Sequence, residues 1–128
     1  MPDSKMRILV VDDFATMRRI IKNILRQAGY ENIVEADDGA TALPKLKTDR
    51  IDLVIADWNM PNMSGLDLLK AVRSDEGLKD IPFLMVTAEA QKENIVAAVQ
   101  SGVSNYVVKP FTPETLRGKI EQIFSEKA

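Results

Sequence analysis

The chain has 128 residues, 45% of them hydrophobic and 28% charged, with a formal net charge of −2, which predicts one compact domain with its own core. The absence of cysteine and histidine excludes disulfides, thiolate or imidazole catalysis, haem and ordinary zinc sites. The near-balanced charge argues against direct nucleic-acid binding, and the sequence shows neither a signal segment nor an apolar run near the ~20 residues of a membrane span, so we expect a soluble, cytoplasmic protein.

The hydrophobic pattern predicts strands and helices that alternate along the whole chain. Residues 7–11 form an apolar, β-branched run that is typical of a strand covered on both faces. Apolar residues at helical spacing then predict an amphipathic helix from Phe14 to a stop at Gly29. Further strands are expected at 32–36, 51–56, 81–86 and 105–108, and further helices at 39–47, 64–73, 92–100 and 113–124. This alternation favours parallel strands joined by right-handed crossovers.

Several residues near helix ends carry signals of their own. Ser64, with Asp67 three residues later, resembles a capping box, and Thr112 is a hydroxyl cap before Pro113 at a first helical position. Pro44 falls inside the second helix, where it lacks a donor and clashes with the preceding turn at a cost of up to ~3 kcal/mol. We therefore expect that helix to be short or kinked.

Polar side chains follow four of the predicted strands. Asp12 and Asp13 come after the first strand, Asp57 after the third, Thr87 after the fourth and Lys109 after the fifth. Taken singly, each is more typical of a turn, a cap or a solvated surface. The carboxyl ends of parallel strands meet at one edge, however, and ligands bind there where the strand order reverses. We interpret the set as a functional site.

Clustered carboxylates need a counter-charge. Two of them about 5 Å apart repel by roughly 3 kcal/mol at an effective dielectric constant of ~20. Mg²⁺ relieves such repulsion, because it prefers carboxylate, carbonyl and water oxygens and often shares a phosphate oxygen. With the ion bound, one carboxylate could attack phosphorus while the ion and an ammonium group neutralise the developing charge. The pattern therefore indicates aspartyl-phosphate chemistry.

Four segments resemble, in order and spacing, the receiver domain of two-component response regulators. They are Val10–Asp13, Asp57–Gly65, Val86–Ala88 and Val108–Phe111. Details such as Asp13-Phe14, Met17-Arg18-Arg19 and Tyr106-Val107-Val108 are similar to the single-domain chemotaxis regulators of that family. The resemblance implies an α/β, flavodoxin-like, doubly wound five-stranded parallel sheet in the order 2-1-3-4-5 with five helices. It further implies a single receiver domain over residues 1–128 without an output domain. Ser64 replaces an Asp common in the family, and both residues cap helices well.

The resemblance also implies roles for the residues at the site. Asp57 would accept the phosphoryl group, and Lys109 would pair with it. Asp12, Asp13, Asp57 and the main-chain carbonyl of Asn59 would hold Mg²⁺. The Lys109–Pro110 bond resembles the family's cis peptide, which is otherwise uncommon.

Other residues would connect the phosphoryl group to the surface. Thr87 would bond a phosphoryl oxygen and move inward, and Tyr106 would rotate from exposed to buried. Asn59 and Glu89 would tune hydrolysis by shaping the access of water. Phe14 is expected to pack locally, beside the metal loop.

By the same resemblance, partner proteins would bind the surface formed by the fourth helix, fifth strand and fifth helix. They would be a histidine kinase, a flagellar motor switch protein and a dedicated phosphatase, all engaging a monomer that catalyses only its own phosphorylation and dephosphorylation. The residues that this surface offers are Ala90, Lys92, Ile95, Tyr106, Val108, Phe111, Thr112 and Lys119.

Other functions remain open from the sequence. A stand-alone receiver could act in a phosphorelay or another kinase pathway. A Mg²⁺-dependent phosphohydrolase with an aspartyl-phosphate intermediate would need a substrate cleft and usually a cap domain, for which this length leaves no room. A flavodoxin-like flavin binder would need a Ser/Thr/Gly-rich phosphate loop after the first strand, where Asp12 and Asp13 would instead repel a phosphate.

Overall fold

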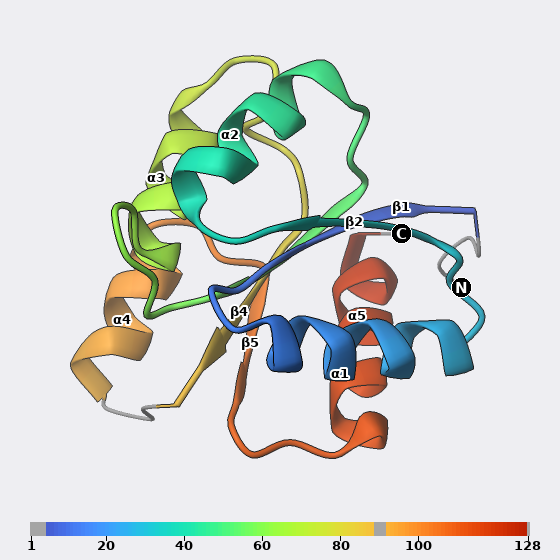
Figure 1. Ribbon diagram of the computed structural model, residues 1–128. Coiled ribbons are helices and arrows are strands. Elements are labelled where there is room, and N and C mark those ends of the chain that lie inside the picture. The colour runs from blue at the N-terminus through green and yellow to red at the C-terminus, as the bar shows by residue number, and fades with distance from the viewer. Residues whose placement is uncertain (1–4, 89–91, 128) are drawn as a thin grey trace.

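Figure 1 shows the computed structural model, which describes residues 5–88 and 92–127. A single parallel sheet has the strand order β2-β1-β3-β4-β5, as the family resemblance implied. The strands are β1 (Arg7–Val11), β2 (Asn32–Ala36), β3 (Leu53–Asp57), β4 (Phe83–Thr87) and β5 (Asn105–Val108). The helices are α1 (Ala15–Gln27), α2 (Gly39–Thr48), α3 (Gly65–Ser74), α4 (Lys92–Gln100) and α5 (Pro113–Lys127).

Helices cover both faces of the sheet and form three layers. In Figure 1, α1 and α5 lie on one side, with α2, α3 and α4 on the other. Because successive strand residues point to opposite faces, Ile8 and Val10 pack with the α1 and α5 side, and Leu9 and Val11 pack with α2 and α3. This double burial explains why the strand segments are almost uniformly apolar.

Two strands have boundaries that differ from those predicted. The third strand begins at Leu53 instead of Ile51, and the fourth at Phe83 instead of Ile81; each ends one residue later than expected. Ile51 is only 5% exposed and packs in the core, although it lies before the β3 ladder. Hydrophobicity indicates burial and not strand pairing. The predicted strands therefore began too early, within the loops that precede β3 and β4.

Local hydrogen bonds fix the beginnings of several helices. The Ser64 hydroxyl accepts a bond from the Asp67 N–H at 3.1 Å, and the Thr112 hydroxyl accepts one from the Thr115 N–H at 3.1 Å, which confirms both hydroxyl caps. At Ser64 this is one half of the expected capping box. The start of α2 has a full capping box between Asp38 and Thr41 that the sequence reading did not identify.

The second helix contains Pro44 and is one residue longer than the predicted 39–47. It spans ten residues and continues past the proline to Thr48, whose hydroxyl donates to the Pro44 carbonyl at 3.0 Å. No helix among residues 5–88 and 92–127 is both long enough and apolar enough to cross a membrane.

Replacing Pro44 with Ala should stabilise the protein. The substitution restores a helical N–H and removes the ring from the preceding turn, which outweighs the greater freedom of the unfolded chain. We expect a gain of about 1–2 kcal/mol in the free energy of unfolding by urea titration. Pro113→Ala is the matched control, since proline is tolerated at the first position of α5; an equal gain there would contradict the explanation.

Candidate metal centre

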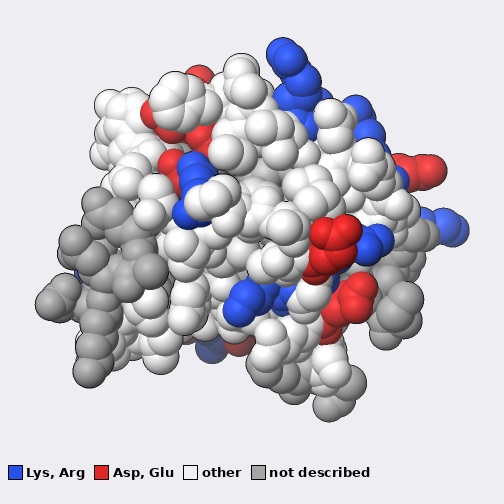
Figure 2. All heavy atoms as spheres, turned by 90° about the horizontal axis from the view of Figure 1, so that it is seen from below, with Lys and Arg blue, Asp and Glu red and all other residues white. Residues whose placement is uncertain are grey.

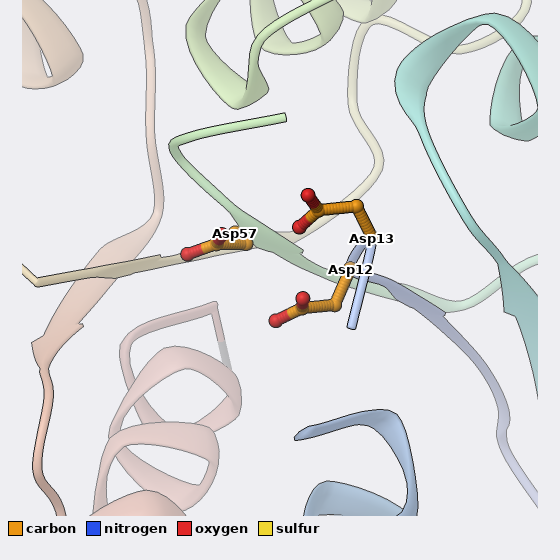
Figure 3. Close-up of side chains that lie close together, drawn as sticks. All are labelled: Asp12, Asp13 and Asp57. Atoms are coloured by element: carbon orange, nitrogen blue, oxygen red, sulfur yellow. The ribbon is translucent and has the colours of Figure 1, made fainter. Parts of the chain in front are cut away.

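Three carboxylates converge at the carboxyl edge of the sheet. Asp12 and Asp13 follow β1, and Asp57 ends β3. Because β1 and β3 are neighbours and Val11 pairs with Ala56, the residues that follow this pair meet side by side. One oxygen from each carboxylate lies within 4.8 Å of the others, and Figure 3 shows the three groups converging. The cluster predicted from the strand ends is present.

The three acids differ in their exposure to solvent. Asp12 is fully buried and Asp57 is 6% exposed, whereas Asp13 is exposed. The Asp12 Oδ1 atom accepts a hydrogen bond from the Phe14 N–H at 2.9 Å. The buried Asp12 Oδ2 atom accepts no hydrogen bond from the described residues. An oxygen in that state is ready to coordinate a cation.

Lys109 brings the one ammonium group that the sequence placed at this edge. Its Nζ atom lies 3.0 Å from Asp57 Oδ1 and 3.7 Å from Asp12 Oδ2. Its backbone N–H donates to the Thr87 carbonyl at 2.7 Å, which anchors the residue beside β4. The Lys109–Pro110 peptide bond is cis, as expected from the family resemblance.

Burial makes the two inner carboxylates reluctant to ionise. Desolvation raises the pKa of Asp12, with a smaller contribution from the charge of Asp57. Desolvation also raises the pKa of Asp57, although the hydrogen bond and charge of Lys109 oppose the shift. One ammonium group thus only partly compensates two buried acids and a third exposed one.

The donor set suits Mg²⁺. It consists of hard carboxylate oxygens, one of which lacks a hydrogen bond, and it is open to solvent on the side of Asp13. Asn59 lies two residues after Asp57 in an exposed loop. The residues present therefore fit this ion.

The loop after β3 is held close to the sheet by a glycine. The Gly65 N–H donates to the Trp58 carbonyl at 2.9 Å. A Cβ at position 65 would lie 2.3 Å from the Asp57 carbonyl oxygen and 2.8 Å from Met85 Sδ. Only glycine allows α3 to approach the end of β3 this closely.

Two further predicted site residues lie nearby. Thr87 ends β4 and is 4% exposed. Tyr106 lies on β5 and is half-buried against the core on the α2 and α3 side. The Lys119 ammonium sits 5.4 Å from the centre of the Tyr106 ring, which is a cation–π contact. Glu89 lies outside the described residues.

The predicted output surface is described only in part. Ile95, Val108, Phe111 and Lys119 are half-buried, and Thr112 is exposed. Ala90 lies outside the described residues, as does the side chain of Lys92 at the start of α4. Val96 and Val99, which were not among the expected surface residues, are 42% and 59% exposed on α4. Both residues are apolar, which could have drawn attention to them. The spacing of apolar residues does not show, however, that this side of α4 faces solvent.

Phe14 corrects one expectation. It was predicted to pack locally, yet 67% of it is exposed. It occupies the N-cap position of α1, where the backbone is extended and the side chain leaves the apolar face of the helix.

Figure 2 shows the face seen from below Figure 1, where acidic and basic side chains are interspersed among neutral ones.

Comparison with known proteins agrees with this geometry. Residues 8–121 match the family model of the response regulator receiver domain. The chain therefore belongs to the response regulator receiver family.

Its relatives narrow the assignment to the CheY chemotaxis type. The chain is 61% identical over 119 residues to the chemotaxis protein CheY of Pseudomonas aeruginosa, covering 93% of this chain and 96% of that protein. It is 58% identical over 122 residues to the chemotaxis protein CheY-3 of Vibrio cholerae, covering 95% and 94%. Relatives of this kind are phosphorylation-activated chemotaxis response regulators, and the chain shares that general function.

Solved structures show the same fold. The Vibrio cholerae chemotaxis protein CheY4 superposes with a TM-score of 0.87 at 38% identity, covering 93% of this chain and 98% of that chain. The receiver domain of a signal transduction histidine kinase from Syntrophus aciditrophicus has a TM-score of 0.86 at 27% identity, covering 94% and 91%.

Mg²⁺ should raise the melting temperature. At ten times the dissociation constant, binding to the folded state contributes about 1.4 kcal/mol, or roughly 3–6 °C. Asp13→Ala should abolish this response and raise the melting temperature of the metal-free protein, because it removes one of three clustered charges. Calorimetry in EDTA and in MgCl₂ measures both effects. Glu31→Ala, an exposed acid away from the cluster, should respond to Mg²⁺ like the wild type.

The raised pKa of Asp57 predicts a pH dependence in metal-free protein. Above the ordinary carboxyl pKa of about 4, the folded state retains this proton longer than the unfolded state, so the free energy of unfolding falls as pH rises through the raised pKa. Asp57→Asn does not titrate, and its stability relative to wild type should therefore increase over that window. Urea titrations in EDTA test this. Parallel pH profiles for the two proteins would contradict the shift.

Proposed function

We propose that the protein is a switch that accepts a phosphoryl group on Asp57 from a histidine kinase and then binds a flagellar motor switch protein. The observation that supports this most strongly is the joint position of Asp57, two further carboxylates and Lys109 at one edge of the sheet. The family and its CheY relatives support the same proposal. A cytoplasmic location, predicted from the sequence, belongs to it.

In this proposal Asp57 is the nucleophile. A carboxylate oxygen of Asp57 forms a bond to phosphorus as the bond from phosphorus to the histidine nitrogen of the donor breaks, and that nitrogen keeps the electron pair and takes up a proton. Asp12, Asp13, Asp57 and the Asn59 carbonyl would hold Mg²⁺, which supplies charge neutralisation for the phosphoryl oxygens. Lys109, already 3.0 Å from Asp57, would follow its charge to the phosphoryl group.

Burial of Asp57 serves this reaction in two ways. A poorly solvated carboxylate is a better nucleophile than one covered by water, and the surrounding residues limit the water that could hydrolyse the product. Asn59 and Glu89 would set that residual access. Catalysis would extend only to the protein's own phosphorylation and dephosphorylation, the latter with help from a dedicated phosphatase.

Asp57→Asn should block phosphorylation by a small-molecule donor. Wild-type protein incubated with acetyl phosphate and Mg²⁺ should gain one phosphoryl group per chain by intact-protein mass spectrometry, and the gain should disappear when EDTA is present. The amide cannot serve as the acceptor. Asp49→Asn, which changes an exposed acid at the end of α2, is the control and should label normally. Undiminished labelling of Asp57→Asn would overturn the assignment.

The same reaction separates the switch from a phosphohydrolase. A switch consumes donor slowly and in proportion to its own labelling, whereas a phosphohydrolase turns over many equivalents of a generic phosphate ester. Sustained turnover would favour the hydrolase.

The output step would run from Thr87 to Tyr106. A phosphoryl group adds nearly two negative charges and strong acceptor oxygens beside the Thr87 hydroxyl at the end of β4. Thr87 would move toward it, and Tyr106 would turn into the space behind. Tyr106 is half-buried and lies under the Lys119 ammonium, so this rotation would alter the surface between β5 and α5. The proposed surface comprises Ala90, Lys92, Ile95, Tyr106, Val108, Phe111, Thr112 and Lys119.

Activation should increase binding to the motor. Beryllofluoride with Mg²⁺ mimics the phosphoryl group, and we expect treated protein to bind a flagellar motor-switch peptide at least ~10-fold more tightly, a coupling typical of two-state switches. Fluorescence anisotropy of the labelled peptide measures the affinity. Asp57→Asn with the same treatment is the control and should show no gain. Equal binding with and without beryllofluoride would favour a phosphorelay or another kinase pathway.

A further inference from the structure

Arg18 joins the segment that carries Asp12 and Asp13 to the neighbouring strand β2. Its Nη1 atom donates to the Asp12 carbonyl oxygen at 2.6 Å, and its Nε atom donates to Glu35 Oε1 at 3.1 Å. The Arg18 side chain is 18% exposed. Lys22 Nζ lies 2.9 Å from the second carboxylate oxygen of Glu35, and Lys45 donates to the Glu35 carbonyl. Of these three cations, only Arg18 contacts Asp12 within the part of the chain that the structure describes.

The carbonyl that Arg18 holds belongs to the peptide between Asp12 and Asp13. The Asp12 N–H donates to the Ala36 carbonyl at 3.2 Å, and its Oδ1 atom accepts from the Phe14 N–H at 2.9 Å. Those two bonds engage the Asp12 N–H and one of its carboxylate oxygens, but not its carbonyl. The Asp12 carbonyl, in the peptide that leads to the exposed Asp13, accepts its hydrogen bond from Arg18.

We propose that Arg18 is a positioning residue for the cation site. By bridging Glu35 and the Asp12 carbonyl, its guanidinium holds the Asp12–Asp13 peptide so that both carboxylates face Asp57. The inference rests on the proposed Mg²⁺ site, and it assigns a function to a residue that touches neither the ion nor the phosphoryl group.

Charge and position predict opposite effects at Arg18. A cation near the site repels Mg²⁺, so electrostatics alone would make binding tighter when Arg18 is neutralised. Loss of positioning would make binding weaker, because the carboxylates no longer share one geometry. Partners behind metal ligands typically change affinity by 10–100-fold, and we expect the lower end here.

Three variants separate the two effects. Arg18→Gln removes both the charge and the bridge. Arg18→Lys keeps the charge, but a compact ammonium group on a flexible stem cannot reproduce the two-sided contact of a guanidinium. Lys22→Gln removes an equal charge and an equal contact with Glu35, while leaving the Asp12 carbonyl bond in place. It is the matched control.

The experiment is a MgCl₂ titration of each folded protein by Trp58 fluorescence. We expect the dissociation constant to rise by about tenfold in Arg18→Gln, to rise severalfold in Arg18→Lys, and to stay equal or fall in Lys22→Gln. If Arg18→Gln does not fold, Arg18→Lys decides the question, since charge alone predicts no change for it.

A second measurement needs no metal. In EDTA, hydrogen exchange of the Phe14 amide reports whether the Asp12 segment is held, and it should be faster in both Arg18 variants than in Lys22→Gln. If the Arg18 variants bind Mg²⁺ as tightly as wild type, or their Phe14 amides exchange at the Lys22→Gln rate, the inference is overturned while the proposed function stands. If wild-type protein itself shows no Mg²⁺ binding, the proposed function is overturned and the inference with it.

Discussion

The repulsion among Asp12, Asp13 and Asp57 is the constraint on which the rest of the site depends. Their oxygens lie within 4.8 Å of one another, and two of the three side chains are buried. Lys109 offsets part of this charge through its 3.0 Å contact with Asp57. The remaining negative charge would attract a divalent ion, and a phosphorylated Asp57 would present further charge to the same ammonium group. The arrangement therefore suits the binding of a cation beside a phosphorylated carboxylate.

The parallel sheet creates this crowding and also makes it tolerable. Neighbouring β1 and β3 end at the same level, so residues that follow them must meet. The helices on both faces keep the strands buried and fixed, which prevents the acids from separating. Thr87, at the end of β4, and Lys109, directly after β5, are joined through a backbone hydrogen bond of 2.7 Å. Phosphorylation of Asp57 would therefore act on side chains such as those of Thr87 and Lys109, while the buried sheet around them stays rigid.

Much of this arrangement could be predicted from the sequence. Apolar runs located the strands, the alternation with helices gave their parallel pairing, and acids after the runs located the site. Contacts made by long side chains could not be predicted in this way: Arg18 bonds both the Asp12 carbonyl and Glu35 of β2, and only the folded structure shows that its guanidinium reaches both. The role of Asp38 was not predicted for a similar reason. Its carboxylate caps α2 and also accepts a hydrogen bond at 2.9 Å from Asn62, which lies in the loop after β3. Phe14 was expected to pack beside the metal loop, because the sequence does not show on which side of a helix start an aromatic ring will lie.

The close fit of Gly65 against Asp57 links the acceptor strand to α3 as one mechanical unit. A Cβ there would come within 2.3 Å of the Asp57 carbonyl oxygen, so strand end and helix start share a boundary with no slack. Any displacement of the Asp57 backbone must carry the first turn of α3 along, whereas the Asp57 side chain can react without disturbing either. Any larger residue at position 65 would act as a wedge and push the start of α3 away from the end of β3.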